Sequence, residues 1–221
     1  MNRRTFLATS GAVAVVGVAG CLNEYSTRSY QGENVPLVPT DDALEWFEDD
    51  DAEFVDTRSQ REYEARHIEG AVHSQAPAGN GSDDPVNDWP TDQRIVTYCV
   101  CPHDLAVARG GTLMSEGYEE VYALDDGLQD WIDRDLPMAG TDYDEPLPSY
   151  TVAGEVDPEF SGEEVWIREP EHNQSEVSHV RDDGSYEITF HFEDLEDDTV
   201  LVVQTPEGEY EGTFAQFRGE E

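Results

Sequence analysis

The chain has 221 residues and a formal net charge of −39, because 51 acidic residues face only 12 basic ones, and every one of the twelve is arginine. So negative a surface makes nucleic acid an improbable partner. At about 1 M salt the Debye length falls to roughly 3 Å, and the self-repulsion of the chain is then mostly screened. We therefore expect a halophilic organism, an archaeon, and we interpret the acidic runs as hydrated faces and not as metal sites.

The first 21 residues have the pattern of an export signal. Arg3 and Arg4 precede a run of small apolar residues that ends in Val-Ala-Gly before Cys21. This resembles a twin-arginine signal joined to a lipobox, which implies cleavage before Cys21 and a lipid on its thiol. The apolar run is too short for the roughly 20 residues that a membrane-spanning helix needs. We expect the protein at the cell surface, anchored by lipid to the outer face of the cytoplasmic membrane.

Residues 22–36 are polar and predict a flexible tether with a reach of roughly 20 Å. From 37 to 141 the pattern alternates between strands and helices, which predicts an α/β domain with a mostly parallel sheet that helices cover on both faces. The expected helices are one capped by Thr40, then 60–66 capped by Ser59, 104–116 and 127–134; the expected strands are 53–56, 68–72, 95–98 and 121–124, with a polar loop over 80–92.

Cys99 lies at the abrupt end of an apolar strand, and a helical pattern follows from Asp104. A strand that runs into a helix through a short loop leaves several backbone N–H groups unpaired at the start of the helix. Such groups stabilise a neighbouring thiolate or the anion that the thiolate attacks. The loop from Cys99 to Leu105 is therefore the best candidate for a reactive site.

Two further motifs surround this loop. The segment Phe54–Val72 resembles the opening signature of rhodanese-like domains, Gly117–Trp131 resembles their closing signature, and Leu136-Pro137 fits its end. The resemblance implies a sulfurtransferase or persulfide carrier whose catalytic cysteine is Cys99. It implies a small sulfur donor and a thiol or protein acceptor as partners, and no metal or organic cofactor.

The loop departs from the family pattern. Rhodaneses commonly carry an arginine five residues after the cysteine, where this chain has Asp104. The related phosphatases need an arginine one position later, where this chain has Leu105, so phosphatase chemistry is disfavoured. The nearest cations in the sequence are His103 and Arg109, which puts thiosulfate in doubt as the donor. We interpret Asp104 as a helix cap in preference to a catalytic acid.

The remaining loop residues are Val100, Cys101, Pro102 and His103. Three uses of Cys101 compete, and we give them in order of preference. Cys101 packs in the loop as a small apolar residue or modestly tunes the site, or it pairs with Cys99 in a redox-sensitive disulfide. In the third use, Cys101 binds a soft metal together with Cys99 and His103. The alternative to an enzyme is a catalytically weak or inactive rhodanese-like lipoprotein that binds a partner or senses redox state through Cys99 and Cys101.

Four residues of the opening signature are interpreted as structural. Asp56 and Arg58 are expected to hold the turn between strand and helix as a local ion pair. His67 is expected to make a structural hydrogen bond, and Gly70 belongs to the same motif.

Beyond a linker at 142–149, the helical period gives way to alternation between polar and apolar residues. Residues 150–218 predict a small antiparallel β-sandwich that loosely resembles transthyretin or carboxypeptidase-regulatory modules. Its predicted strands are 150–154, 164–168, 177–180, 185–193, 199–205 and 209–217. We expect a binding or spacer module without chemistry of its own.

Overall fold

The computed structural model describes residues 25–100 and 104–218. The predicted signal, the lipidation site Cys21 and three loop residues, Cys101, Pro102 and His103, lie outside the described residues. Within the described ranges no helix has the length and apolar character that crossing a membrane requires.

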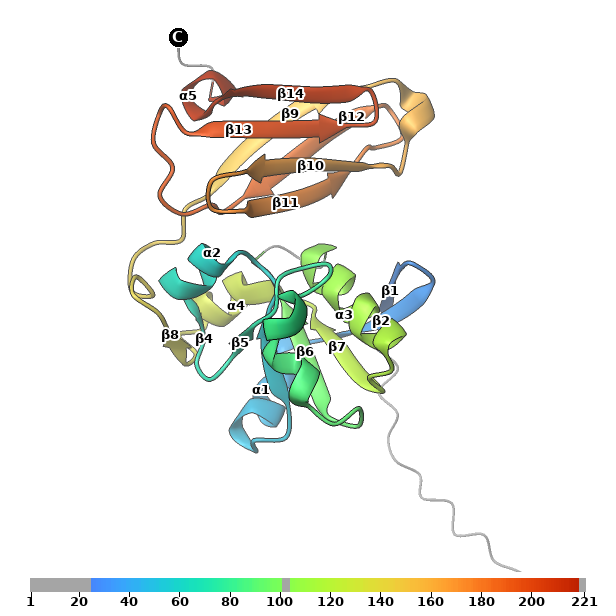
Figure 1. Cartoon of the computed structure of the whole chain (residues 1–221), viewed down its shortest axis with the longest axis vertical. Coiled ribbons are helices and arrows are strands. Elements are labelled where there is room, and N and C mark those ends of the chain that lie inside the picture. The colour runs from blue at the N-terminus through green and yellow to red at the C-terminus, as the bar shows by residue number, and fades with distance from the viewer. Residues whose placement is uncertain (1–24, 101–103, 219–221) are drawn as a thin grey trace, which may run out of the picture.

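The N-terminal unit is an α/β layer structure built on a six-stranded sheet (Figure 1). Its strands run in the order β1-β2-β7-β6-β3-β5, and all neighbours are parallel except β1 and β2. The strands are β1 (Thr27–Tyr30), β2 (Glu33–Val38), β3 (Glu53–Asp56), β5 (Val72–His73), β6 (Arg94–Tyr98) and β7 (Glu120–Leu124); the helices are α1 (Thr40–Glu48), α2 (Gln60–Ala65), α3 (Asp104–Glu116) and α4 (Gly127–Asp133). Two short strands, β4 (His67–Ile68) and β8 (Met138–Ala139), pair at the side, and the polar loop holds the turns η1 (Gly81–Asp83) and η2 (Pro85–Asp88).

Alternation along the strands divides the core of this unit into two layers, because successive side chains of a strand point to opposite faces. On β6, Val96 and Tyr98 pack with Trp131 of α4, whereas Ile95 packs with Leu113 of α3. Helices α1 and α4 therefore cover one face and α3 covers the other. The predicted α/β architecture with a mostly parallel sheet is confirmed.

The structure corrects three local predictions in this unit. Residues 27–38, which the sequence assigned mostly to a tether, form the hairpin β1–β2 and join the sheet. The predicted strand 68–72 is two short strands, β4 and β5, because Gly70 adopts φ +80° between them. Helix α1 begins at Thr40 after Pro39, and Thr40 does not cap it but donates through its hydroxyl to Asp126 over 3.1 Å.

The C-terminal module, residues 150–218, consists of antiparallel strands. A four-stranded sheet in the order β11-β10-β13-β14 and the pair β12–β9 share one apolar core, an arrangement consistent with the expected β-sandwich. Its elements are β9 (Tyr150–Glu155), η3 (Pro158–Phe160), β10 (Glu164–Glu169), β11 (Gln174–His179), β12 (Ser185–Phe190), β13 (Val200–Thr205), β14 (Gly208–Thr213) and α5 (Phe214–Phe217). The predicted strand 209–217 is thus wrong in its second half, because Thr213 and Gln216 form a capping box that starts α5.

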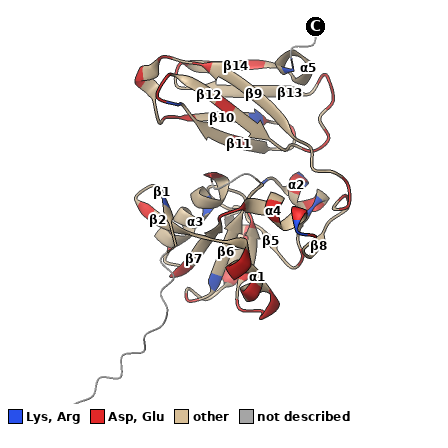
Figure 2. Cartoon of the chain, turned by 180° about the vertical axis from the view of Figure 1, so that it is seen from behind, with Lys and Arg blue, Asp and Glu red and all other residues tan. Residues whose placement is uncertain are grey.

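The module is seated on the edge of the α/β unit where the parallel strands end (Figures 1 and 2). There the Arg66 guanidinium, just beyond α2, binds Glu193 with Nε and Oε1 3.0 Å apart. Gln75, just beyond β5, exchanges two hydrogen bonds of 2.8 and 2.9 Å with Asn173. Because carboxyl ends of parallel strands gather at one edge of a sheet, these contacts place the module over the loops where α/β proteins carry their sites.

Candidate active site

Cys99 follows the last residue of β6 at this edge. Its carbonyl accepts a 2.9 Å hydrogen bond from the Leu128 N–H at the start of α4, which fixes the backbone of the turn. The same packing leaves no room at Gly127, where an added Cβ would lie 2.4 Å from the Val100 carbonyl oxygen. Cys99 therefore sits on a rigid backbone at the junction between the central strand and the site loop.

The Cys99 side chain is buried, with 1% of the residue exposed. It belongs to an apolar cluster with Leu105 and Val107 of α3, and Val177 of β11 lies in the same cluster with Trp166 packed against it. The apolar cluster that buries Cys99 is thus built from its own domain and from the C-terminal module. The expected ring of loop N–H groups around its sulfur involves residues outside the described part of the chain.

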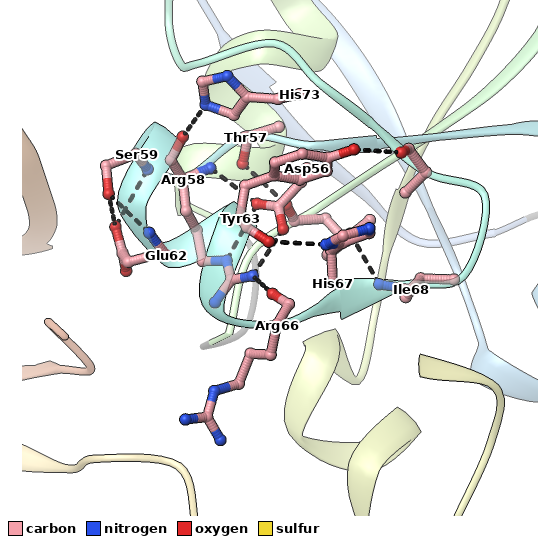
Figure 3. A network of polar contacts seen from close by, with 12 residues as sticks. Asp56, Thr57, Arg58, Ser59, Glu62, Tyr63, Arg66, His67, Ile68 and His73 are labelled. Atoms are coloured by element: carbon pink, nitrogen blue, oxygen red, sulfur yellow. Dashed lines mark hydrogen bonds and ion pairs between the residues drawn. The ribbon is translucent and has the colours of Figure 1, made fainter. Parts of the chain in front are cut away.

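Asp56 and Arg58 form the ion pair that the sequence predicts (Figure 3). Arg58 Nε and Nη2 donate to the two Asp56 oxygens over 3.0 and 2.6 Å, and Nη2 also donates to the Arg66 carbonyl oxygen over 2.6 Å. Burial opposes the guanidinium charge, but Asp56 holds the pKa of Arg58 above its ordinary value. Both side chains are buried, and Arg58 Nη1 has no hydrogen-bond partner among the described residues. The pair holds the turn between β3 and α2.

Helix α2 begins next to this pair through a capping box. The Ser59 backbone N–H and hydroxyl donate to Glu62 Oε2 over 3.0 and 2.7 Å, and the Glu62 N–H returns a bond to Ser59 Oγ (Figure 3). Burial raises the pKa of Glu62 to about 7, although Arg58 opposes the rise. A carboxyl whose pKa lies near neutrality is therefore placed beside the sheet edge.

His67 has the structural role expected for it. Its Nδ1 lies 2.7 Å from the Tyr63 carbonyl oxygen, and its ring stacks on the Tyr63 ring at 4.0 Å between centroids. His67 and Gly70, which lies in the turn between β4 and β5, together fix the course of the backbone between α2 and the sheet.

Asp104 does not occupy the cap position assigned to it, because it is itself a helical residue, the first described residue of α3. Its carboxylate lies 3.1 Å from Arg28 Nη1 and 3.9 Å from His179 Nδ1 of the module. Arg109, one of the two nearest cations in the sequence, is buried and donates to Ser74 Oγ over 2.7 Å and to Asp84 over 3.3 Å. Arg109 is therefore committed to its own carboxylate and does not replace the missing loop arginine.

Glu176 of β11 is a buried carboxyl that sequence reasoning missed. It is 6% exposed, and its Oε1 accepts a 3.0 Å hydrogen bond from the Val177 N–H. Burial raises the pKa of Glu176 to about 8, and the charges of Glu62 and Asp104 act in the same direction. The sequence around Glu176 is polar, so it gives no local signal that this carboxyl is buried.

The elevated pKa of Glu176 predicts a pH dependence of stability. The folded state holds a proton that the unfolded state has already released above about pH 4.5, so stability falls as the pH rises from there to about 8. The fall has an upper bound of about 1.4 kcal/mol per pH unit. Urea unfolding at fixed molar salt should show a shallower fall for Glu176→Gln, with the variant the more stable protein at pH 9. Glu187→Gln, at an exposed position of the same module, is the control, and equal slopes for all three proteins would contradict the prediction.

Within residues 25–100 and 104–218, one group of side chains has metal-ligand chemistry, namely Glu169, Glu171 and His172, whose ligand atoms lie within 4.8 Å of one another. The Glu169 carboxylate already accepts backbone N–H bonds of 2.7 Å from Glu171 and 2.9 Å from His172. These two hydrogen bonds belong to the turn between β10 and β11, and they explain the position of the Glu169 carboxylate. Binding of a soft metal by Cys99, Cys101 and His103 stays a prediction, because Cys101 and His103 lie outside the described residues.

Residues 39–134 match the family model of the rhodanese-like domain. They form a rhodanese-like domain. Its central strand is β6, and Cys99 stands at the carboxyl end of that strand. The two signatures on either side form the turn into α2 and the start of α4, which together frame the Cys99 loop. The predicted family of this segment is thereby confirmed.

Solved structures similar to this chain include three with related descriptions. The rhodanese-like domain of an Anabaena protein is 20% identical, with 50% of this chain and 83% of that chain covered and a TM-score of 0.42. A polysulfide-sulfur transferase homodimer from Wolinella succinogenes is 19% identical, with 51% and 83% covered and a TM-score of 0.40. A human single-domain sulfurtransferase is 16% identical, with 45% and 97% covered and a TM-score of 0.39.

Proposed function

We propose that this protein is a sulfurtransferase or persulfide carrier that uses Cys99 as its nucleophile. The observation that carries the proposal is the position of Cys99, which lies between the central strand and α3 of a rhodanese-like domain. The two family signatures supply the rigid frame around it, through the buried pair of Asp56 and Arg58 and the contact of Leu128 with the Cys99 carbonyl.

The reaction consists of two displacements at sulfur. The Cys99 thiolate attacks the sulfane sulfur of a donor R–S–S⁻, a bond forms between the two sulfurs, and R–S⁻ leaves with the electron pair of the broken bond. An acceptor thiolate then attacks the outer sulfur of the persulfide, and the Cys99 thiolate leaves. No net oxidation occurs and no cofactor takes part.

The test is sulfur uptake by the intact protein. After incubation with excess polysulfide in molar salt and removal of the donor, the intact mass should increase by one sulfur atom, and a thiol acceptor should restore the original mass. No increase under these conditions would count against the proposal.

A second candidate has one observation in its favour, the burial of Cys99 in an apolar cluster to which the C-terminal module contributes. Reactive cysteines are usually partly exposed, so a cysteine held in this closed state suits a protein that binds or senses redox state with little turnover. A stable disulfide between Cys99 and Cys101 in natively purified protein, measured by thiol titration before and after mild reduction, supports this alternative.

We also propose that the protein is a lipoprotein of a halophilic archaeon, held by Cys21 at the outer face of the cytoplasmic membrane. The support is the paired arginines, the lipobox pattern and the net charge of −39. In detergent phase partition, the protein from native membranes should enter the detergent phase and the Cys21→Ala variant the aqueous phase. Partition of both into the aqueous phase would refute the lipid anchor.

A further inference from the structure

A cleft of about 250 Å³ lies where three parts of the chain meet, namely β1 of the N-terminal hairpin, the first turns of α3, and the paired strands β10 and β11 of the C-terminal module (Figure 1). Only α3 belongs to the segment 39–134 that matches the family model. Two of the three walls are therefore additions of this chain to the rhodanese-like domain. The cleft is smaller than the usual pocket for a drug-sized ligand, so it suits a smaller molecule.

The cleft shares side chains with the surroundings of Cys99. Val107 of α3 and Val177 of β11 line the cleft, and both belong to the apolar cluster that buries Cys99. Trp166 of β10 also lines the cleft and packs against the same cluster. These apolar side chains therefore form the boundary between a ligand in the cleft and the surroundings of the thiol. Sulfur transfer to such a ligand requires this boundary to part.

Charged groups of both signs line the cleft, and one of them is already engaged. The Asp104 carboxylate has Oδ1 3.1 Å from Arg28 Nη1 and Oδ2 3.9 Å from His179 Nδ1. Asp104 thus holds two cationic side chains at the cleft, and its own charge is compensated by them.

Arg28 and Glu164 keep hydrogen-bonding capacity for a ligand. A guanidinium has five N–H donors, and within the described residues Arg28 uses one of them, toward Asp104. Glu164 accepts a 3.0 Å hydrogen bond at Oε2 from Trp166 Nε1, and its Oε1 accepts none from the part of the chain that the structure describes. The cleft therefore offers donors for a carboxylate on β1 and an acceptor for an ammonium group on β10.

We propose that this cleft binds the sulfur acceptor, and that the acceptor is a small zwitterionic thiol with a carboxylate and an ammonium group, as in an amino acid. Arg28 binds the carboxylate, and Glu164 binds the ammonium group. The inference rests on the proposed sulfur transfer at Cys99 and names the class of its acceptor. A cysteine within a protein does not fit, because peptide bonds occupy its amino and carboxyl groups.

The chemical step is a displacement at sulfur. The acceptor thiolate attacks the outer sulfur of the Cys99 persulfide, and a bond forms between these two sulfurs. The bond to the Cys99 sulfur breaks, and Cys99 leaves as a thiolate with the electron pair. The acceptor becomes R–S–S⁻, so no net oxidation occurs.

The test is discharge of the persulfide by four small thiols that differ in charge: zwitterionic cysteine, cationic cysteamine, anionic 3-mercaptopropionate and neutral 2-mercaptoethanol. The full chain with Cys101→Ser is loaded with polysulfide in molar salt and freed of the donor. Loss of the added sulfur is then followed by intact mass, and peptide mapping assigns it to Cys99. For each thiol the rate of a variant is divided by the rate of the parent, which cancels the intrinsic reactivity of that thiol.

Two substitutions should give a crossed pattern. Arg28→Gln should slow discharge by cysteine and 3-mercaptopropionate about two- to fivefold, as expected for a half-exposed charge, and leave the other two thiols within about 1.5-fold. Glu164→Gln should slow cysteine and cysteamine by a similar factor and spare 3-mercaptopropionate. A general disturbance of the structure would slow all four thiols alike. Arg181→Gln and Glu187→Gln, at an exposed ion pair of the same module, are the controls.

A binding measurement separates this inference from the proposed function. S-methylcysteine carries both charges and no thiol, so calorimetric titration reports binding in the cleft without sulfur transfer. Its affinity should fall about two- to fivefold in Arg28→Gln and in Glu164→Gln. If the protein takes up no sulfur but binds S-methylcysteine in this charge-dependent way, the cleft site stands and the proposed function fails.

The opposite result is equally decisive. If sulfur uptake is normal and neither substitution changes discharge by one charge class of thiol more than by another, the inference is overturned and the proposed function is unaffected. Discharge by 2-mercaptoethanol that falls as much as discharge by cysteine would also overturn it, because the loss would then not depend on the charge of the acceptor.

Discussion

Cys99→Ser is expected to abolish sulfur uptake by the intact protein. Serine keeps the size and the backbone of the site, but its hydroxyl is not ionised near neutral pH and cannot form a persulfide. Because Cys99 lies in the apolar cluster with Leu105 and Val177, the replacement buries a hydroxyl, and the free energy of unfolding should fall by about 1–3 kcal/mol. Intact mass after polysulfide treatment is the measurement, with urea unfolding to establish that the variant is folded.

The matched variant for this experiment is Cys101→Ser. If Cys101 only packs in the loop, this protein should take up one sulfur as the parent does. If Cys101 resolves the persulfide, the added sulfur should persist longer in Cys101→Ser than in the parent. Retention of sulfur in Cys99→Ser at the level of the parent would show that Cys99 is not the acceptor of the donor sulfur.

Arg58→Met is expected to lower the free energy of unfolding by about 3–5 kcal/mol. The change leaves the Asp56 carboxylate buried without its partner, and breaking a buried ion pair from one side has that typical cost. It also removes the hydrogen bond from Nη2 to the Arg66 carbonyl oxygen, which ties the turn to the end of α2. Urea unfolding at fixed molar salt measures the loss.

Two variants serve as controls for Arg58→Met. Arg181→Met breaks an exposed pair with Glu187 and should change stability by at most about 1 kcal/mol. Adding Asp56→Asn to Arg58→Met removes the orphaned charge and should recover part of the loss. A cost for Arg58→Met no larger than that for Arg181→Met would show that the pair does not hold the turn.

Much of the rhodanese-like domain could be predicted from local patterns. Val96 and Tyr98 alternate with Ile95 because a strand sends successive side chains to opposite faces, and that period is visible in the sequence. The pairing of Asp56 with Arg58 was also predictable, because both residues lie in one turn. Cys99 stood out for the same reason, since the end of a strand and the start of a helix are both local signals.

The hairpin β1–β2 could not be predicted in this way. Its residues are polar and carry a weak strand pattern, so their composition favoured a tether. They become strands because β2 pairs with β7, where Leu37 meets Ala123 and Val38 meets Leu124. The pairing that joins this hairpin to the sheet comes from a strand more than eighty positions along the chain, and no local propensity encodes it.

The sequence by itself determined the charge of the protein, the family signatures and the identity of the nucleophile that we propose, because each is written in neighbouring residues. Only the tertiary structure decided that Cys99 is buried in an apolar cluster shared with Val177 of the C-terminal module, and that Glu176 is buried where the charges of Glu62 and Asp104 raise its pKa. The reason is physical. Burial and charge at a site depend on which distant surfaces pack together, and the contact of Arg66 with Glu193 joins residues 127 positions apart.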